Sequence, residues 1–516
     1  MPIGTACLPL DQKKSYSEHS RPHTVVASRP VHRPAQGIRK ENSAMTQPDD
    51  LTHVQPTAQP GARPTTGNLT IAELTELVAS REVDTVIVAF TDMQGRLVGK
   101  RTAARLFLDE FAKHGAECCN YLLAVDVEMN TVEGYTISSW ETGYGDMVMM
   151  PDMNTLRKAP WLAGTVIVTA DLTWLDERPV APSPREILKK QIARLAEHGL
   201  VPYAATELEF IVFDEDYRTA WKKGYNDLTP ASDYNIDYAL LASTRMEPLL
   251  RDIRNSMDGA GMYCEGVKGE CNFGQQEIGF RYTDALATCD NHSIYKNGAK
   301  EIADAHGKSL TFMAKFNERE GNSCHIHLSV RGTDGSAVLA DKDRPNGFSK
   351  MMEHFIAGQL ATMREMSLFF APNINSYKRY VEGSFAPTAV AWGLDNRTCA
   401  LRVVGSGHGL RVENRVPGGD VNQYLAVAAL IAGGLYGIEN ELELEPMFEG
   451  NAYGSDAPRV PTSLREAAAL FAGSAIATEA FGAEVVEHYL NNARIEQRTY
   501  DAAITDWERV RGFERL

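Results

Sequence analysis

The run Ala205-Thr206-Glu207-Leu208-Glu209-Phe210 decides how the rest of this chain is interpreted. It places two carboxylates two residues apart in an apolar, strand-like segment that continues through Phe213. In a β-strand, residues i and i+2 point to the same face of the sheet, so Glu207 and Glu209 are expected side by side. Two like charges on a buried face are costly unless a cation lies between them. Either this face is exposed to solvent, or it binds cations.

Composition limits the classes of protein to which the chain can belong. It has 516 residues, 43% of them hydrophobic, and a formal net charge of −16. An acidic chain is poorly suited to non-specific nucleic-acid binding, which depends on neutralising phosphates. No apolar run reaches the roughly 20 residues of a membrane span. The eight cysteines include no C-x-x-C pair, which favours reduced thiols and a cytoplasmic location.

The chain is expected to form two domains after a disordered tail. Residues 1–68 are rich in Pro, Ser, Thr, Gln and Arg and lack the apolar core of a signal peptide. Met45 is an alternative start within this tail. A capping box at Thr70 and Glu73 opens a predicted helix that ends near Ala79. With strands predicted at 84–90 and 96–98, it indicates an N-terminal α+β domain over 69–160.

The larger second domain is predicted to span residues 161–516. A strand is expected at 165–170, followed by a helix with Ser183 as N-cap, Pro184 in the first turn and Gly199 as terminator. Beyond it, strands alternate irregularly with helices, without the regular βαβ repeat of a parallel sheet. This pattern favours the α+β class.

Five further residues downstream supply acids and imidazoles. Glu270 and Glu277 flank a Gly-containing turn, His325 and His327 share one face of a predicted strand, and Glu413 lies between arginines. Singly, these could be surface acids, hydrogen-bonded core histidines and an ion-paired glutamate. Together with the first two glutamates they make an oxygen-rich set that suits Mg²⁺ or Mn²⁺ better than zinc. Five carboxylates need more than one divalent ion, as in phosphoryl-transfer sites.

Arginines close to these segments offer partners for anions. Arg397 and Arg402 stand five residues apart, Arg415 follows Glu413 by two, and Arg379 lies in a basic segment after Lys378. Guanidinium groups bind carboxylates and phosphates in a planar, two-pronged geometry. Ordinary surface arginines are the alternative for each one taken singly.

The order of these motifs resembles the glutamine synthetase superfamily, type I-like, from about Thr70 to the C-terminus, and within it the γ-glutamyl-amine ligases most. The matching elements are TELEF at 206–210, GECNFGQQEI at 269–278, FMAK at 312–315, GNSCHIHLS at 321–329, NSYKRY at 375–380, NRTCALR at 396–402 and RVENR at 411–415. The resemblance implies an N-terminal β-grasp-like domain and a catalytic domain with a curved antiparallel sheet and surrounding helices. It also implies a homo-oligomer, a dodecamer of two stacked hexameric rings with active sites between subunits.

The resemblance further implies that ATP phosphorylates the side chain of glutamate and that an amine then displaces the phosphate. Two or three Mg²⁺ or Mn²⁺ ions per site are implied, with substrate-side ligands Glu209, Glu270 and Glu277 and nucleotide-side ligands Glu207, His325 and Glu413. The other matches are Arg379, Arg415 and Gly321 for glutamate and Arg397, Arg402, Glu265 and His327 for ATP. Arg397 and Glu270 are the matches expected to take part in the chemical step.

The amine pocket departs from the family pattern. In glutamine synthetases a glutamate in a PGYEAP-like segment closes over ammonium, whereas here Phe385 stands at that position. A phenyl ring cannot balance the charge of ammonium, but it can pack against an alkyl chain. The second ammonium-site acid of the family is not matched, and Asp126 or Glu128 could replace it. Tyr453 lies near a tyrosine that some members adenylylate, but its neighbours differ and no such control is predicted.

These observations leave three functions to compare. The first is an ATP-dependent ligase that joins glutamate to an organic amine such as ethanolamine, an alkylamine or a polyamine. The second is glutamine synthetase itself, which uses ammonium. The third is a catalytically silent protein that binds nucleotide or metal and acts as a regulator. The sequence does not identify the amine, because Phe385 disfavours ammonium without defining what meets the far end of a larger molecule.

Overall fold

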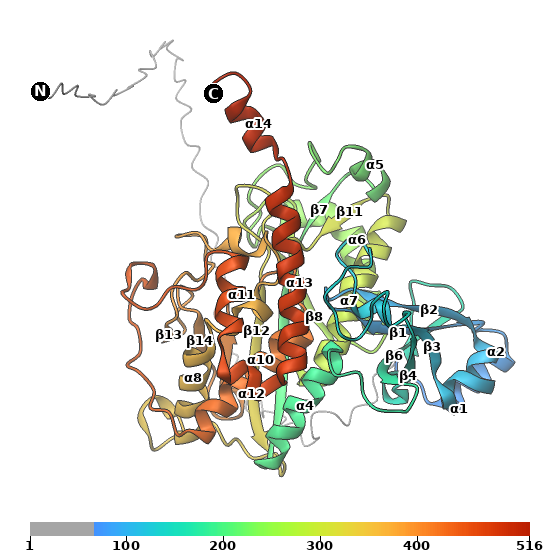
Figure 1. Ribbon diagram of the computed structural model, residues 1–516, viewed down its shortest axis with the longest axis horizontal. Helices are drawn as coiled ribbons and strands as arrows, with labels where there is room; N and C mark the ends of the chain where they lie inside the picture. Colours follow the sequence, from blue (N-terminus) through green and yellow to red (C-terminus); the bar gives the residue numbers. More distant parts are fainter. Residues whose placement is uncertain (1–66) are drawn as a thin grey trace, which may run out of the picture. The chain divides into compact units, whose positions relative to one another are not determined.

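The computed structural model describes residues 67–516, and Figure 1 shows their arrangement. Apart from Gly67 and Asn68, the predicted disordered tail and the alternative start lie outside these residues. Gly67 accepts a backbone hydrogen bond from Lys158, and Asn68 forms a β-bridge with Arg157. The last two residues of the predicted tail are therefore paired with the first domain.

The first sheet has the strand order β2-β1-β6-β4-β3, with β5 paired to β6. Its strands are β1 (Thr85–Thr91), β2 (Leu97–Ala103), β3 (Ala116–Cys119), β4 (Asp146–Pro151), β5 (Arg157–Lys158) and β6 (Thr165–Trp174). β1 and β2 form the predicted antiparallel hairpin, whereas β1 and β6 run parallel. Val86, Val88 and Phe90 alternate into the core, as a strand with one buried face requires.

The helix α1 (Ile71–Ala79) precedes this sheet and carries the predicted capping box. The backbone N–H of Glu73 donates to the Thr70 hydroxyl, and the Glu73 carboxylate accepts from the Thr70 N–H. The predicted boundary at residue 160 lies before β6, although β6 pairs with β1 and β4. The division into 69–160 and 161–516 stays a proposal, and the strand pairing favours a boundary after Trp174.

The second sheet has the order β13-β14-β15-β12-β7-β9-β8, with β10 and β11 also paired to β7. Its strands are β7 (Leu200–Phe213), β8 (Cys264–Gly269), β9 (Gln275–Phe280), β10 (Thr283–Asp284), β11 (Ser309–Thr311), β12 (Cys324–Gly332), β13 (Trp392–Leu394), β14 (Leu401–Val404) and β15 (Arg411–Asn414). All pairs are antiparallel except β13 with β14. The long strand β7 contains the TELEF motif at 206–210 and forms most of the strand pairing in this sheet.

Helices pack around both sheets and complete the α+β architecture that the sequence predicted. After α1 they are α2 (Ala104–Leu106), α3 (Ala112–His114), α4 (Pro184–Glu197), α5 (Tyr217–Lys222), α6 (Leu240–Gly259), α7 (Ala285–Ala305), α8 (Lys350–Thr362), α9 (Ser367–Phe370), α10 (Gln423–Glu439), α11 (Leu464–Ala472), α12 (Ala475–Phe481), α13 (Ala483–Ala502) and α14 (Asp506–Gly512). Figure 1 shows α11 beside the long helix α13. Within residues 67–516, no helix combines the length and apolar character needed to cross a bilayer.

The helix α4 begins and ends where the sequence indicated, with one difference at its N-terminus. Ser183 occupies the N-cap position, Pro184 is the first helical residue, and Gly199 follows the helix at a φ of +70°. The Ser183 side chain makes no capping hydrogen bond. The start of α4 therefore depends on the proline and on tertiary contacts rather than on a serine cap.

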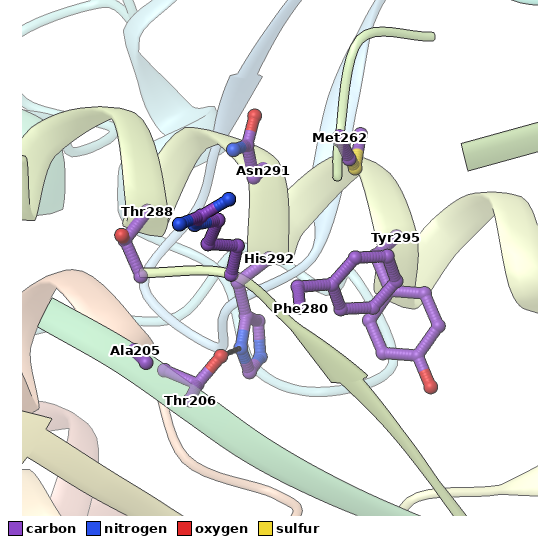
Figure 2. A pocket seen from close by; sticks show the side chains of 9 residues that line it. Ala205, Thr206, Met262, Phe280, Thr288, Asn291, His292 and Tyr295 are labelled. Carbon is purple, nitrogen blue, oxygen red and sulfur yellow. Dashed lines mark hydrogen bonds between the residues drawn. The ribbon is translucent and has the colours of Figure 1, made fainter. Parts of the chain in front are cut away.

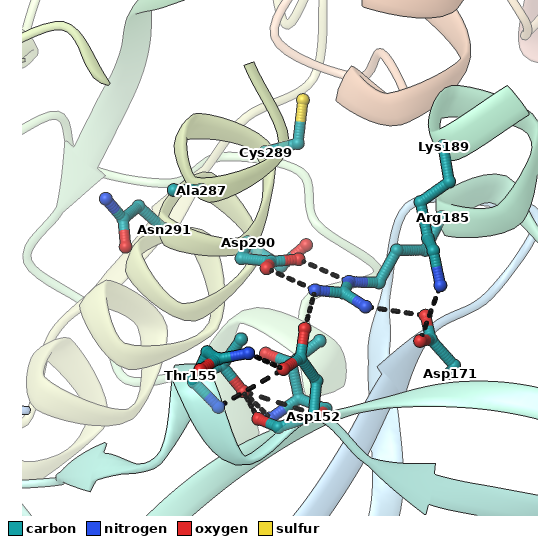
Figure 3. Close-up of polar contacts among 12 residues, drawn as sticks. Asp152, Thr155, Asp171, Arg185, Lys189, Ala287, Cys289, Asp290 and Asn291 are labelled. Carbon is teal, nitrogen blue, oxygen red and sulfur yellow. Dashed lines mark hydrogen bonds and ion pairs between the residues drawn. The ribbon is translucent and has the colours of Figure 1, made fainter. Parts of the chain in front are cut away.

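A buried charge cluster ties α4 and α7 to the first sheet (Figure 3). The Arg185 guanidinium of α4 is 3% exposed and contacts Asp290 of α7 at 2.9 Å, Asp171 of β6 at 2.5 Å and Asp152 at 2.8 Å. The Tyr424 hydroxyl of α10 also donates to Asp290 at 2.6 Å. Removing one partner of a buried ion pair leaves an uncompensated charge, so this cluster links α4, α7 and α10 to the first sheet.

Candidate active site

The register of the second sheet places the predicted ligands in cross-strand rows. Glu277 of β9 lies opposite Glu209 of β7, and His325 of β12 lies opposite Glu207 of β7. Directly opposed residues have Cβ atoms about 4.5–5.5 Å apart. On the other side of β12, Glu413 of β15 lies opposite His327. The two glutamates on β7 therefore share a face, as predicted, and meet partners from different neighbouring strands.

The first carboxylate group consists of Glu209, Glu270 and Glu277. One oxygen from each lies within 4.8 Å of the others. Glu209 is held by the Ser323 N–H at 2.7 Å and by Nε2 of Gln275 at 3.0 Å. Burial, together with the charges of Glu209 and Glu207, raises the pKa of Glu277 to about 8. This group needs a cation before all three carboxyls can be ionised at neutral pH.

The second group consists of Glu207, His325 and Glu413, again with ligand atoms within 4.8 Å of one another. Nδ1 of His325 lies 3.3 Å from Glu207 and 3.6 Å from Glu413. Nε2 of the same ring is buried and lacks a hydrogen-bond partner within residues 67–516. Burial and the nearby Arg415 lower the pKa of His325. A neutral imidazole is the form that binds metals.

Both ring nitrogens of His327 form hydrogen bonds, and this residue does not belong to the second ligand group. Its Nδ1 accepts from Nε of Arg411 at 3.2 Å, and its Nε2 lies 2.8 Å from Glu207. Because a guanidinium can only donate, Nε2 carries the proton and donates to Glu207. Burial favours the neutral form of Glu207, but the two imidazoles outweigh it and hold the pKa of Glu207 well below its usual range. His327 thus orients Glu207, and its predicted contact with ATP stays a prediction.

Glu413 is fully buried between two arginines. Nη1 of Arg402 donates to it at 2.7 Å, and Arg415 pairs with its other oxygen. Burial raises the pKa of Glu413, but His325 and Arg415 reverse this effect and leave it below the usual value. Glu413 is therefore both ion-paired within the chain and a member of the second ligand group. Arg402 also pairs with Asp395 at 2.5 Å, so much of its donor capacity is used within the chain.

Two residues predicted to contact glutamate lie in tight surroundings. Arg379 is 2% exposed and donates to the Val416 carbonyl at 2.9 Å and the Ser323 hydroxyl at 2.9 Å. A Cβ added at Gly321 would lie 2.2 Å from the Ala314 carbonyl oxygen, so no side chain fits there. Both positions fix the backbone around the first carboxylate group. Their contacts with glutamate stay predictions.

Two residues predicted to bind ATP lie outside the two ligand groups. Arg397 is exposed in the turn between β13 and β14, and Glu265 is exposed where β8 is irregular between Cys264 and Gly266. The contacts of these two residues do not test their predicted roles, which stay predictions.

Phe385 lies in a strained and exposed loop. Its φ is +59°, a left-handed conformation that bulky residues rarely adopt, and it is 56% exposed. Nη2 of Arg415 donates to the Phe385 carbonyl at 3.4 Å, and the Tyr453 hydroxyl donates to the next carbonyl, that of Ala386, at 3.1 Å. These bonds link the loop to Arg415, which also pairs with Glu413. Tyr453 is 7% exposed and supports this loop.

Three residues that the sequence interpretation did not single out complete the site. Lys268 pairs with Glu270 and lies 3.7 Å from Glu277, Gln275 binds Glu209, and Arg411 orients His327. Lys268 stands two residues before Glu270, a spacing that could have placed both on one strand face. Gln275 and Arg411 gave no comparable signal, because their partners come from neighbouring strands that are distant in the sequence.

A small cavity of about 20 Å³ lies between β7 and α7, apart from both ligand groups (Figure 2). Its lining includes Thr206, Thr288, His292 and Tyr295. Figure 2 shows the His292 ring directed at Thr206, whose hydroxyl lies 3.0 Å from Nδ1. Because Thr206 alternates with Glu207 along β7, this contact fixes the strand from behind. The cavity contains none of the predicted ligands.

The donor chemistry of the two groups fits hard divalent cations. They present five carboxylates and one neutral imidazole, and neither includes a thiolate. Oxygen-rich sets of this kind suit Mg²⁺ or Mn²⁺. A third group, Asp237 with Glu270 and Cys271, shares a ligand with the first. The sheet thus offers two separate positions for a cation, one toward β9 and one toward β12 from the central strand β7.

Residues 181–511 match the catalytic domain of glutamine synthetase. The match covers more than half of the chain, and the protein belongs to the glutamine synthetase family. Its motifs, sheet register and carboxylate groups agree with this membership.

Two individual relatives and one solved structure are similar to most of this chain. The gamma-glutamylethanolamide synthetase GlnA4 of Streptomyces coelicolor is 60% identical over 448 residues, which cover 87% of this chain and 96% of that protein. The glutamate–isopropylamine ligase of a Pseudomonas species is 36% identical, covering 86% and 97%. The solved GmaS/ADP complex has a TM-score of 0.75 at 26% identity and covers 86% of this chain and 99% of its own. This last similarity confirms the predicted fold.

Proposed function

We propose that this enzyme joins glutamate to a small organic amine in an ATP-dependent reaction, with ethanolamine as the first candidate. One observation carries the proposal: both carboxylate groups are assembled, while Phe385 replaces the acid that would hold ammonium. The names of the two relatives, one of them 60% identical, agree with an organic amine as the second substrate.

Members of this family use ATP and divalent metals. The proposed ligands are Glu209, Glu270 and Glu277 on the substrate side, and Glu207, His325 and Glu413 on the nucleotide side, for two or three Mg²⁺ or Mn²⁺ ions. Bound ions would offset the repulsion between an anionic carboxylate and an anionic phosphoryl group. The neutral His325 ring and the ionised Glu207 are in the protonation states that ligation needs.

The chain's own residues would orient the two anionic reactants. Arg379 and Arg415, with the closely packed backbone at Gly321, are proposed to hold glutamate, whereas Arg397 and Arg402 are assigned to the phosphates of ATP. The nucleotide would also contact Glu265 and His327. Guanidinium groups near the transferred phosphoryl stabilise charge that develops in the transition state.

The proposed reaction has two steps. An oxygen of the γ-carboxylate of glutamate attacks the γ-phosphorus of ATP, and ADP leaves. The amine nitrogen then attacks the acyl carbon, phosphate leaves with that oxygen, and the nitrogen loses a proton. Phe385 would pack on the carbon chain of the amine, and Asp126 or Glu128 are the proposed acids on the amine side.

The test is a substrate panel that measures ADP release with glutamate plus ethanolamine, isopropylamine, putrescine or ammonium. We expect the highest kcat/KM with an organic amine. Turnover that is as efficient with ammonium alone would assign the chain as a glutamine synthetase. ATP binding without glutamate-dependent ADP release from any amine would assign it as a silent nucleotide-binding regulator.

Assembly and location are part of the same proposal. The family supports a homo-oligomer, proposed as a dodecamer of two stacked hexameric rings with active sites between subunits, located in the cytoplasm. Light scattering on the purified protein measures the mass directly. A monomer with full activity would contradict active sites shared between subunits.

A further inference from the structure

Lys268 is aligned with the first carboxylate group by the sheet register itself. In β8 it lies opposite Glu277 of β9, which in turn lies opposite Glu209 of β7. The three residues therefore form one row across three strands and share one face. Cross-strand neighbours stay about 4.5–5.5 Å apart at Cβ whatever rotamers they adopt. A cationic side chain is thus held beside this group by the backbone.

The contacts of the Lys268 ammonium agree with this placement. Nζ pairs with Glu270 and lies 3.7 Å from Glu277. The side chain of Lys268 is 28% exposed, while those of Glu270 and Glu277 are 16% and 12% exposed. On its outer side, Nζ lies 5.2 Å from the centre of the Tyr238 ring. The ammonium therefore sits between two carboxylates and an aromatic face.

We propose that Lys268 is an internal counter-ion of the substrate-side carboxylates, which a divalent ion must displace when it binds Glu270 and Glu277. The inference rests on the metal site of the proposed function. Two cations cannot both occupy the oxygens that face one another in this group, because like charges at such distances repel strongly in a partly buried site. Lys268 thus stabilises the metal-free site and weakens its affinity for metal.

The ring of Tyr238 would keep the displaced ammonium close to the site. The Tyr238 ring already lies within cation–π distance, and the Tyr238 N–H donates to the Gly269 carbonyl next to Lys268. The lysine needs only a rotamer change to leave the carboxylates, since β8 itself stays paired with β9. It would remain beside the bound ion and the reacting anions as an additional positive charge.

The first test measures Mn²⁺ binding to the full chain by electron paramagnetic resonance titration, in wild type, Lys268→Met and Lys268→Arg. We expect Lys268→Met to bind one class of Mn²⁺ at least ten-fold more tightly and to melt at a lower temperature without metal. Lys268→Arg should keep the wild-type affinity. Lys308→Met is the matched control, because it removes an exposed lysine–carboxylate pair, with Asp214 at 2.6 Å, away from the site.

A second measurement uses wild-type protein and does not depend on the folding of a variant. Acylation of lysines by a hydroxysuccinimide ester, followed by mass spectrometry, should show Lys268 reacting faster once Mn²⁺ is added, while Lys308 is unchanged. Unaltered Lys268 reactivity together with unaltered Mn²⁺ affinity in Lys268→Met would overturn the counter-ion role. Weaker binding in Lys268→Met would do the same.

A failure of the metal site itself has a different signature. Glu277→Gln should lose the class of Mn²⁺ that Lys268→Met tightens. If Glu277→Gln keeps every class, the ligand assignment of the proposed function is wrong. If it loses one class and Lys268→Met leaves that class unchanged, only the counter-ion role is wrong.

Discussion

At the scale of single residues, glutamates on one sheet face have pKa values that are shifted in opposite directions. The pKa of Glu207 is held low by two imidazoles that outweigh its burial, whereas burial and two nearby carboxylates raise the pKa of Glu277 to about 8. The difference follows from the strand opposite each residue. β12 brings histidines to Glu207, and β9 sets Glu277 against Glu209.

Metal binding to the substrate-side group should release a proton. Because the pKa of Glu277 is about 8, this carboxyl is largely protonated at pH 7 in the metal-free protein, and ligation requires its ionised form. Apparent Mn²⁺ affinity should therefore rise as the pH increases through about 8 and level off only once the pH lies above the pKa of Glu277. Calorimetric titration in buffers of different ionisation enthalpy measures close to one released proton per subunit at pH 7. Identical heats in all buffers would contradict the account.

The Phe385→Glu variant should shift the preference of the enzyme toward ammonium. A carboxylate at this exposed loop position could balance the charge of ammonium, which a phenyl ring cannot do. We expect the kcat/KM ratio of ammonium to ethanolamine to rise by roughly ten-fold, equivalent to about 1.4 kcal/mol. Phe385→Gln is the control for size and polarity without charge. An unchanged amine profile in Phe385→Glu would refute the assignment of this pocket.

At the scale of structural elements, the loop after η5 (Ser376–Arg379) is shaped by contacts with distant segments. The carbonyls of Phe385 and Ala386 accept from Arg415 and Tyr453, and the Val390 N–H donates to the Pro458 carbonyl. Phe385 has a left-handed conformation that costs about 1–3 kcal/mol, and the surrounding bonds offset this cost.

Removing the Tyr453 hydroxyl should loosen the amine loop specifically. Tyr453→Phe deletes the bond to the Ala386 carbonyl, so we expect the KM for the amine to rise several-fold while the KM values for glutamate and ATP stay unchanged. The loss of stability should be about 1 kcal/mol. Tyr489→Phe deletes a comparable bond, to the Pro182 carbonyl at 2.9 Å, and should leave the amine KM unaltered. Equal effects of the two variants on the amine KM would remove Tyr453 as a positioning residue.

At the scale of the whole molecule, the buried Arg185 cluster determines how the first sheet meets the helices behind β7. Arg185→Met leaves Asp290 and two further aspartates without their shared cation. Urea unfolding should show a loss of about 3–5 kcal/mol. Arg178→Met removes an exposed pair with Asp176 and should cost about 1 kcal/mol or less. Similar losses for both variants would show that the cluster is not a stabilising junction.

Motif spacing predicted that the acids and imidazoles of the two groups would lie close together, because their placement depends on local alternation and on strand order; their binding of metal stays a prediction. Glu207 and Glu209 needed only the two-residue period of a strand, and His325 came from an equally clear strand. Contacts that depend on chain folding over long distances were not predictable in this way. The bond of Gln275 to Glu209, the bond of Tyr453 to the Ala386 carbonyl and the inclusion of β6 in the first sheet all belong to this kind.

The central claim is amide formation from glutamate and an organic amine through an acyl phosphate. The most direct test supplies glutamate labelled with ¹⁸O in its γ-carboxylate, ATP and equal amounts of ethanolamine and ammonium, and analyses the products by mass spectrometry. The account predicts γ-glutamylethanolamide as the main amide and ¹⁸O in the released phosphate. Glutamine as the main product, or phosphate without ¹⁸O, would contradict it.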